Sequence, residues 1–255
     1  MSIQPRLWAL IVAGGTGTRF GGQVPKQYVD LAGKPTIRWS IEAFLALEET
    51  AGVMVAIGAG QDAPFAQATA GLADVMTTSG GATRQESVHR GLEALAKAGA
   101  TPEDVVMIHD AARPLIHSRD IHQVYAALLR DSARGYALGF PQSDALKHAG
   151  ADGLVQGERI RKETWAVQTP QGFALGVILV AHRALATQGL TPGEDSPSDD
   201  LAVATRGGVA CALIRPAHVN IKLTEQTDTV AIEELLRVRA TDSAMSGLAR
   251  RMKAA

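Results

Sequence analysis

The sequence predicts an α/β protein with a mostly parallel sheet that carries helices on both faces. Two observations support this prediction. The strand-like segments are continuous apolar runs without regular polar alternation, so both faces of the sheet are expected to be covered. Helical patterns lie between these runs, and a strand–helix–strand order implies right-handed crossovers between parallel strands.

Six apolar runs are expected to form the strands of this sheet. The strongest include "WALIVA" and "VVMIHD", and two weaker ones are "DVMTT" and "YALGF". Ligands of such sheets bind beyond the carboxyl ends of the strands, so the loops that follow these runs are the first places to look for function. In chain order the expected strands cover 8–13, 53–58, 74–78, 105–110, 136–140 and 209–215.

The helices between these strands are predicted from the spacing of apolar residues and from capping signals. Val88, Leu92 and Leu95 recur at i, i+4 and i+7, which places them on one helix face. Ser118 is expected to be the N-cap of the following helix, because its hydroxyl accepts a backbone N–H readily. The expected helices cover 35–48, 84–98, 118–134 and a last segment that begins at Thr227.

The segment 141–168 interrupts the pattern with charges, glycines and alternating apolar positions. It is predicted to leave the sheet as a β-hairpin with its turn near Ala149–Gly153. The composition of 187–200 is typical of a loop. We therefore expect one domain over 1–240, with the excursion as an arm, and a weakly patterned C-terminal tail over 241–255.

The composition restricts the class of protein. The net charge of −1, from 25 basic and 26 acidic residues, argues against a general nucleic-acid-binding protein. The one cysteine, Cys211, excludes an internal disulfide and lies in an apolar run, which favours a core residue over a reactive thiol. No export-signal pattern and no apolar run of about 18 residues is present, so we expect a cytoplasmic protein that does not enter the membrane.

The first loop, in "ALIVAGGTGTRFGGQVPKQY", follows a strand with five glycines, an arginine and a lysine. Gly14, Gly15 and Gly17 allow the backbone N–H groups to approach a phosphate closely. Arg19 and Lys26 add positive charge. This combination predicts an anion-binding loop, and a glycine-rich turn with solvated charges is the alternative.

Two familiar phosphate-binding motifs do not account for this loop. The Gly-Lys-Ser/Thr of a P-loop is absent. The dinucleotide pattern G-x-G-x-x-G fails because Phe20 takes the place of the third glycine. The second strand ends near Gly58 and Gly60, where that pattern needs an acidic residue. A nicotinamide-dependent dehydrogenase is therefore the weaker interpretation.

Other candidate residues lie after later strands. Asp110 ends the run "VVMIHD", and one carboxylate together with substrate phosphates is a typical Mg²⁺ site, although a local ion pair with Arg113 is equally compatible. The segment "GGATRQESV" opens a helix whose N-terminal N–H groups attract anions, and Ser87 lies in it. Arg161 and Lys222 are isolated basic residues, and each alone is typical of a solvated surface charge. They become candidates only because the other sites indicate a phosphorylated ligand.

Taken in order, "AGGTGTR", "PKQY", "GGATRQESV", "HDAARP", "TPQGF" and "NIKLT" resemble the 2-C-methyl-D-erythritol 4-phosphate cytidylyltransferase family, over about residues 8–237. The resemblance implies a three-layer Rossmann-like domain with a protruding β-arm, and a homodimer. It implies an enzyme of isoprene biosynthesis that joins CTP to 2-C-methyl-D-erythritol 4-phosphate, a polyol phosphate, with Mg²⁺ as cofactor and release of pyrophosphate.

The resemblance also assigns roles to residues of this chain. Charge on the reacting phosphates would be stabilised by Arg19, Lys26 and Lys222. Arg161 lies in the arm, so it would reach the site of the partner subunit. The nucleotide would be bound by Ala13, Gly14, Gly15, Gly17, Gly81, Ser87 and Asp110, with Asp110 as the metal ligand. The acceptor would be bound by Arg113, Arg161, Thr169 and Ser198.

The chain departs from the family pattern mainly on the acceptor side. Ala145 and Ser198 stand where the family has threonine, and Gly14 stands where it often has a second alanine. The glycine loop also resembles ribitol-5-phosphate cytidylyltransferases, which more often carry Val for the second Ala of "HDAARP". A cytidylyltransferase for another polyol phosphate is therefore the nearest alternative.

Overall fold

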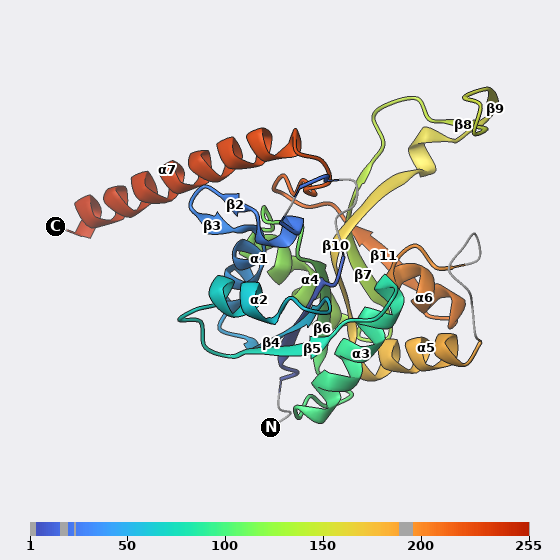
Figure 1. Ribbon diagram of the computed structural model, residues 1–255, viewed down its shortest axis with the longest axis horizontal. Helices are drawn as coiled ribbons and strands as arrows, with labels where there is room; N and C mark the ends of the chain where they lie inside the picture. The colour runs from blue at the N-terminus through green and yellow to red at the C-terminus, as the bar shows by residue number, and fades with distance from the viewer. Residues whose placement is uncertain (1–3, 16–19, 23, 189–195, 255) are drawn as a thin grey trace.

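A seven-stranded sheet forms the centre of the protein, with the strand order β11-β7-β10-β6-β1-β4-β5. Figure 1 shows the computed structural model, which describes residues 4–15, 20–22, 24–188 and 196–254. The strands of the sheet are β1 Leu7–Ala13, β4 Thr50–Ile57, β5 Val75–Ser79, β6 Val105–Asp110, β7 Gly135–Pro141, β10 Trp165–Ala174 and β11 Cys211–Ile214.

The six predicted strands are confirmed, and the sheet contains one strand that the sequence did not predict. β10 pairs antiparallel with both β6 and β7, while the other pairs in the sheet are parallel. Its sequence, "WAVQTPQGFA", places Thr, Pro and Gln inside the apolar run. These residues interrupt the apolar pattern that predicts a strand, and residues 165–168 of β10 fall within the segment 141–168 that was predicted to form the arm.

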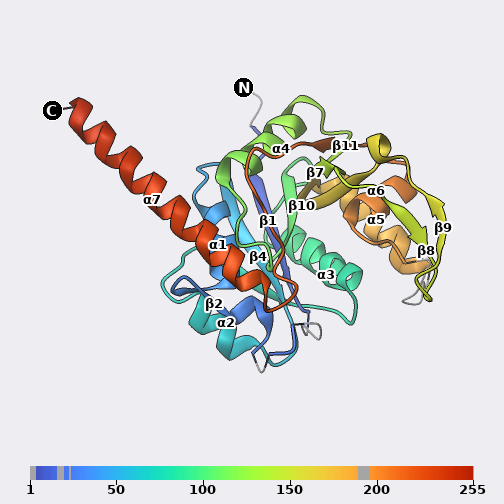
Figure 2. The same cartoon turned by 90° about the horizontal axis from the view of Figure 1, so that it is seen from above.

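Helices cover both faces of the sheet, so the predicted three layers are confirmed (Figure 2). The apolar cluster on one face includes side chains of α1 Thr36–Leu45, α2 Asp62–Ala68 and α4 Ser118–Arg130. The apolar cluster on the other face includes side chains of α3 Arg84–Lys97, α5 Leu175–Thr187 and α6 Asp200–Arg206.

The central strand β1 contributes to both layers. Ala9 and Ile11 belong to one apolar cluster, and Trp8 and Leu10 to the other. Gly91 of α3 lies against Leu10 so closely that a Cβ at position 91 would be 2.3 Å from Leu10 Cδ1. Helix α3 therefore packs tightly onto the strand that leads into the glycine loop.

Several local predictions differ from the structure. Helices α2, α5 and α6 were not predicted. The N-cap of α4 is His117 rather than Ser118, because the His117 imidazole accepts the backbone N–H of Arg119 at 3.1 Å. The last helix, α7, runs over Asp228–Ala254 and so includes the segment predicted as a weakly patterned tail.

Two elements project from the body (Figure 1). The arm ends in the two-stranded hairpin of β8 Lys147–Ala149 and β9 Val155–Glu158, which confirms the predicted hairpin and its turn. Helix α7 projects from another side. Small elements complete the fold: β2 Asp30–Leu31, β3 Lys34–Pro35, and the 3-10 turns η1 Lys26–Tyr28 and η2 Arg161–Glu163. In the described part of the chain, no helix has the length and apolar character needed to span a membrane.

Leu10→Ala is expected to lower the free energy of unfolding by about 2–5 kcal/mol. Leu10 is fully buried on β1, so its removal leaves a cavity between the sheet and α3. Urea denaturation followed by circular dichroism measures this change. The control is Leu154→Ala in the arm, where the side chain is 67% exposed and a change within about 0.5 kcal/mol is expected. Equal losses in the two variants would contradict the placement of Leu10 in the core.

Candidate active site

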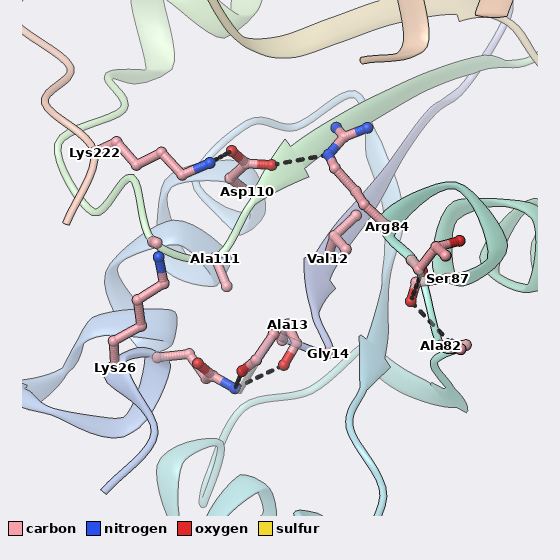
Figure 3. Close-up of a pocket in the computed structure, with 15 residues that line it drawn as sticks. Val12, Ala13, Gly14, Lys26, Ala82, Arg84, Ser87, Asp110, Ala111 and Lys222 are labelled. Atoms are coloured by element: carbon pink, nitrogen blue, oxygen red, sulfur yellow. Dashed lines mark hydrogen bonds and ion pairs between the residues drawn. The ribbon is translucent and has the colours of Figure 1, made fainter. Parts of the chain in front are cut away.

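A cavity of about 310 Å³ opens at the carboxyl ends of β1 and β6. The loop after β1, the N-terminus of α3 and the segment around Lys222 form its walls (Figure 3). Its lining residues are Val12, Ala13, Gly14, Gly15, Lys26, Gln27, Gly81, Ala82, Thr83, Arg84, Ser87, Asp110, Ala111, Ala112 and Lys222.

Gln27 fixes the described part of the first loop from behind. Its buried side-chain amide donates to the carbonyl oxygens of Ala13 at 2.7 Å and Gly15 at 3.1 Å. The same amide donates to the side chain of Gln61 at 2.9 Å. Because the 3-10 turn η1 carries both Gln27 and Lys26, the anchor of the loop and a cation of the cavity have a fixed spacing.

The loop before α3 is held by hydrogen bonds that lie within it. The Ser87 hydroxyl accepts the N–H of Gly81 at 2.9 Å and donates to the carbonyl of Thr83 at the same distance. The Thr83 hydroxyl caps the helix by accepting the N–H of Glu86 at 3.1 Å. A Cβ at position 81 would lie 2.3 Å from Glu86 Cγ, so only glycine fits this turn. Ser87 therefore orders the cavity wall.

Asp110 lies between two cations at the end of β6 (Figure 3). One carboxylate oxygen pairs with Lys222 Nζ at 2.7 Å, and the other pairs with Arg84 Nε at 3.5 Å. A third cation, Arg113, is 4.0 Å away. Burial opposes ionisation of Asp110, but the charges of Arg84 and Lys222 outweigh it and hold the pKa of Asp110 well below its ordinary value. Asp110 is therefore a carboxylate at neutral pH.

A hydrogen-bonded chain positions the backbone on both sides of Asp110. The Asp110 N–H donates to Thr169 Oγ1 at 3.1 Å, and Thr169 Oγ1 contacts His109 Nδ1 at 3.0 Å. His109 Nε2 contacts the carbonyl of Arg113 at 3.2 Å, so it donates and Nδ1 accepts the Thr169 hydroxyl. Complete burial lowers the pKa of His109 to about 4, which keeps this ring neutral. Thr169 and His109 therefore act as a rigid support.

Arg84 connects the cavity to a buried charge cluster under α5 and α6. Its guanidinium donates to Asp200 Oδ2 at 2.7 Å, and Asp200 Oδ1 contacts His182 Nε2 at 3.3 Å. The backbone N–H of Asp200 donates to the Gln171 side chain at 2.9 Å. Burial alone would raise the pKa of Asp200, but Arg84 and His182 outweigh it and lower the pKa. Arg84 Nη1 is buried and has no hydrogen-bond partner among the described residues.

The far wall of the cavity is a chain segment without regular structure that carries Lys222. The N–H of Leu223 donates to the carbonyl of Ala112 at 2.7 Å. Lys26 Nζ donates to the carbonyl of Leu223 at 3.1 Å, so Lys26 of η1 contacts the segment that carries Lys222. The described lining of the cavity therefore contains three cations, Lys26, Arg84 and Lys222, and one carboxylate, that of Asp110. Its net charge is positive.

The structure brings together most of the residues predicted to bind nucleotide. Six of them line the cavity, namely Ala13, Gly14, Gly15, Gly81, Ser87 and Asp110, together with Lys26 and Lys222, which were predicted to stabilise charge on the reacting phosphates. Gly17 and Arg19 lie outside the described residues. The predicted acceptor residues do not line the cavity. Thr169 is buried behind Asp110, Arg113 lies beside it, Ser198 is exposed near α6, and Arg161 lies in the arm, where it donates to the carbonyl of Ser143 at 3.0 Å.

Arg84, Gln27 and Asp200 hold groups of this site in place and were not among the predicted site residues. Arg84 lies in the segment "GGATRQESV" that was predicted to open a helix, but its pairing with Asp110 joins positions 26 residues apart in the sequence. Gln27 follows Lys26 directly in "PKQY", and its position in that motif was the available signal. Asp200 has no local signal for its contact with Arg84, because the two residues are 116 positions apart.

A family model, related sequences and solved structures all indicate the same family for this chain. The family model described as IspD, 2-C-methyl-D-erythritol 4-phosphate cytidylyltransferase, matches residues 7–238. A cytidylyltransferase of that name from Cereibacter sphaeroides is 40% identical over 234 residues, which cover 91% of this chain and 97% of the relative. The solved enzyme of that name from Thermus thermophilus is 30% identical, with a TM-score of 0.73 and coverage of 91% of this chain and 99% of that structure.

Some relatives are longer than this chain. The bifunctional IspD/IspF enzyme of Rhodospirillum rubrum is 41% identical over 230 residues, which cover 90% of this chain and 56% of the relative. The chain thus spans a little over half the length of the bifunctional relatives that it matches.

Asp200→Asn is expected to lower the free energy of unfolding at pH 7 by about 3 kcal/mol, because it removes one partner of a buried ion pair. The pKa of Asp200 is lowered on folding, so its contribution is complete above the unfolded carboxyl pKa of about 4 and is lost as the pH falls below it. Urea denaturation should therefore give a constant difference from wild type between pH 7 and about pH 5, and a smaller one below about pH 4.

The control for this prediction is Glu93→Gln. Glu93 forms an ion pair with Arg183, whose side chain is 55% exposed. We therefore expect the free energy of unfolding to change by at most about 1 kcal/mol. A difference between wild type and Asp200→Asn that grows on acidification would contradict the assignment.

Proposed function

The chain belongs to the 2-C-methyl-D-erythritol 4-phosphate cytidylyltransferase family, and we propose that it catalyses the reaction after which the family is named. An oxygen of the 2-C-methyl-D-erythritol 4-phosphate monoester attacks the α-phosphorus of CTP. The bond from that phosphorus to the bridging oxygen breaks, and pyrophosphate leaves. The product is 4-diphosphocytidyl-2-C-methyl-D-erythritol. The shared name of relatives that match this chain over 97% of their own length supports this proposal.

The observation that carries the proposal is the charge arrangement around one cavity. Lys26, Arg84 and Lys222 border it from three segments of the chain, and Gly14, Gly15 and the N-terminus of α3 complete the described lining. A triphosphate is strongly anionic, and cations with backbone N–H groups at a helix start are the groups that bind it. The volume of about 310 Å³ accommodates part of a nucleotide in a cleft that is open to solvent.

The chemistry of this reaction explains which groups the cavity contains. The attacking phosphate monoester is already anionic at neutral pH, so no general base is needed to activate it. The obstacle is the repulsion between two phosphates and the charge that develops on the α-phosphate and pyrophosphate. Fixed cations weaken this repulsion and stabilise the developing charge, as in phosphoryl transfer generally. We propose this role for Lys26 and Lys222, and their position in the lining of the cavity supports it.

We propose Mg²⁺ as the cofactor and Asp110 as the protein group that holds it. Among the described residues, no three His, Cys, Asp or Glu side chains gather into a metal-binding group. One ionised carboxylate together with substrate phosphates is the usual way in which Mg²⁺ is held at a nucleotide, and Asp110 fits this requirement. When bound, Mg²⁺ would neutralise phosphate charge. Thr169 and His109 hold the backbone of Asp110 in place for that contact.

We propose that the enzyme is a cytoplasmic homodimer joined through the arm. Leu154, Val155 and Ile160 are apolar, and each is more than 60% exposed on the arm of one chain. A second copy of the chain would cover them, because contiguous exposed apolar side chains mark interaction surfaces. Arg161 follows this patch, and we propose that it contacts the acceptor bound to the partner subunit.

The substrate pair is tested by measuring pyrophosphate release from four nucleoside triphosphates, each combined with several polyol phosphates. CTP with 2-C-methyl-D-erythritol 4-phosphate is expected to exceed every other pair by at least about tenfold, because a site that hydrogen-bonds one substrate leaves polar groups unpaired with another. Addition of EDTA should abolish the release, and excess Mg²⁺ should restore it. Faster turnover with ribitol 5-phosphate would assign a different acceptor to the chain.

Lys26→Ala is expected to lower kcat by about 10²–10³-fold, by analogy with the loss of one stabilising donor in an oxyanion site. Thermal denaturation should show a folded protein, because Lys26 lies at the cavity rim rather than in the apolar core. Lys97→Ala is the matched control, since Lys97 is exposed at the end of α3, and its kcat should equal that of the wild type. A Lys26→Ala variant with near wild-type kcat would remove Lys26 from the mechanism.

A further inference from the structure

Residues 216–224, here called the Lys222 segment, form a cavity wall without helix or strand hydrogen bonding. Such a segment has to be fixed by contacts outside regular secondary structure if it is to present one ammonium group accurately, and the N–H of Leu223 makes one of them with Ala112. On the side facing the cavity, Lys222 pairs with Asp110 at 2.7 Å. The N-terminal part of the segment is held by described residues that do not line the cavity.

Asp120 of α4 holds this part with both of its carboxylate oxygens. Oδ1 accepts the backbone N–H of Ala217 at 2.9 Å, and Oδ2 contacts His218 Nδ1 at 2.9 Å. Asp120 is fully buried and lies in the first turn of α4, where the helix N-terminus favours a negative charge. A buried carboxylate with two protein partners is a fixed anchor, because releasing either partner would leave it unsatisfied.

The geometry defines the state of His218. A carboxylate only accepts hydrogen bonds, so Nδ1 of His218 carries the hydrogen that Asp120 receives. The His218 ring stacks on His117, the N-cap of α4, with a centroid separation of 3.8 Å and an interplanar angle of 9°. His218 is thus fixed both by a hydrogen bond in its ring plane and by contact with its face.

Further hydrogen bonds hold the residues between this anchor and Lys222. Arg239 of α7 donates to the carbonyl of Val219 at 3.1 Å and also to the carbonyl of Leu115. The Asn220 side chain donates to the carbonyl of Thr169 at 2.8 Å, and its own backbone carbonyl accepts from Arg113. Residues 217–220 are therefore held at successive positions, and Lys222 follows two residues later.

We infer that His218, held by Asp120, is a positioning residue for Lys222 in the transfer reaction. It does not reach the cavity, because the described lining residues on this segment include Lys222 and not His218. The inference rests on the proposed function of Lys222. Its physical basis is that displacement of a charged group by about 1 Å is enough to lower the rate of a reaction that depends on positioning.

The first test compares His218→Leu with His218→Asn. Leucine removes the Nδ1 donor while keeping an apolar side chain against His117, and asparagine places an N–H donor at the equivalent position. We expect kcat to fall about tenfold in His218→Leu with the KM for CTP changed less than about twofold, and we expect His218→Asn to stay within about threefold of wild type.

Two controls separate positioning from stability. His122 lies on α4, the helix that carries Asp120, where it is 56% exposed and faces Glu49, so His122→Leu should keep wild-type kinetics. Thermal denaturation of each variant identifies any loss of folded protein. A fall in melting temperature for His218→Leu with unchanged kcat would show a purely structural role and overturn the inference.

A double-mutant cycle tests whether His218 acts through Lys222. If it does, His218→Leu should change kcat less than about twofold in a Lys222→Ala background, because the displaced group is already absent. If the full tenfold loss persists in that background, the two residues act independently and the inference is wrong.

A labelling experiment gives an outcome that does not depend on activity. Acetic anhydride acetylates accessible amines, and peptide mass spectrometry reports the rate at each lysine. We expect Lys222 to react at least about threefold faster in His218→Leu than in wild type and at the wild-type rate in His218→Asn, with exposed Lys97 as internal reference. An unchanged Lys222 rate overturns the positioning role even if the enzyme is active. A changed rate in a protein without transferase activity would support the positioning and reject the proposed function.

Discussion

The arrangement of the cavity depends on one ionised carboxylate held between cations at the end of β6. Asp110 pairs with Lys222 on one side and Arg84 on the other. Arg84 comes from the start of α3 and Lys222 from a segment without regular structure, and the two cations would repel each other without the carboxylate between them. Because the Asp110 side chain is only 13% exposed, solvent screens the pairing weakly, and its geometry helps to fix the positions of both cations.

Other contacts hold each of the two cations beside Asp110 in place. Behind Arg84, the buried pair with Asp200 and the contact with His182 tie the cavity to α5 and α6. Beyond Lys222, the Lys222 segment is held to α4 by Asp120. The groups proposed to meet the phosphates are thus supported by residues that never reach the cavity. Such support suits a reaction in which accurate placement of charge replaces acid–base chemistry.

Local patterns were sufficient to predict much of the fold. The apolar runs that became β1, β4 and β6 predicted a parallel sheet, and the spacing in 84–98 predicted α3, because burial on one or both faces leaves a periodic signal. β10 was missed for the opposite reason. It lies between β6 and β7 although polar residues interrupt its sequence, so its place in the sheet depends on pairing with neighbours.

The sequence by itself determined which chemistry is available: the glycine loop with Lys26, the carboxylate of Asp110 at a strand end, and Lys222 near the C-terminus. Only the tertiary structure decided how these groups are combined. It paired Arg84 with Asp110 and Asp200, and it placed Thr169 behind Asp110 rather than in the cavity. The physical reason is that side-chain pairing depends on distance in space, and residues far apart along the chain leave no periodic signal of their contact.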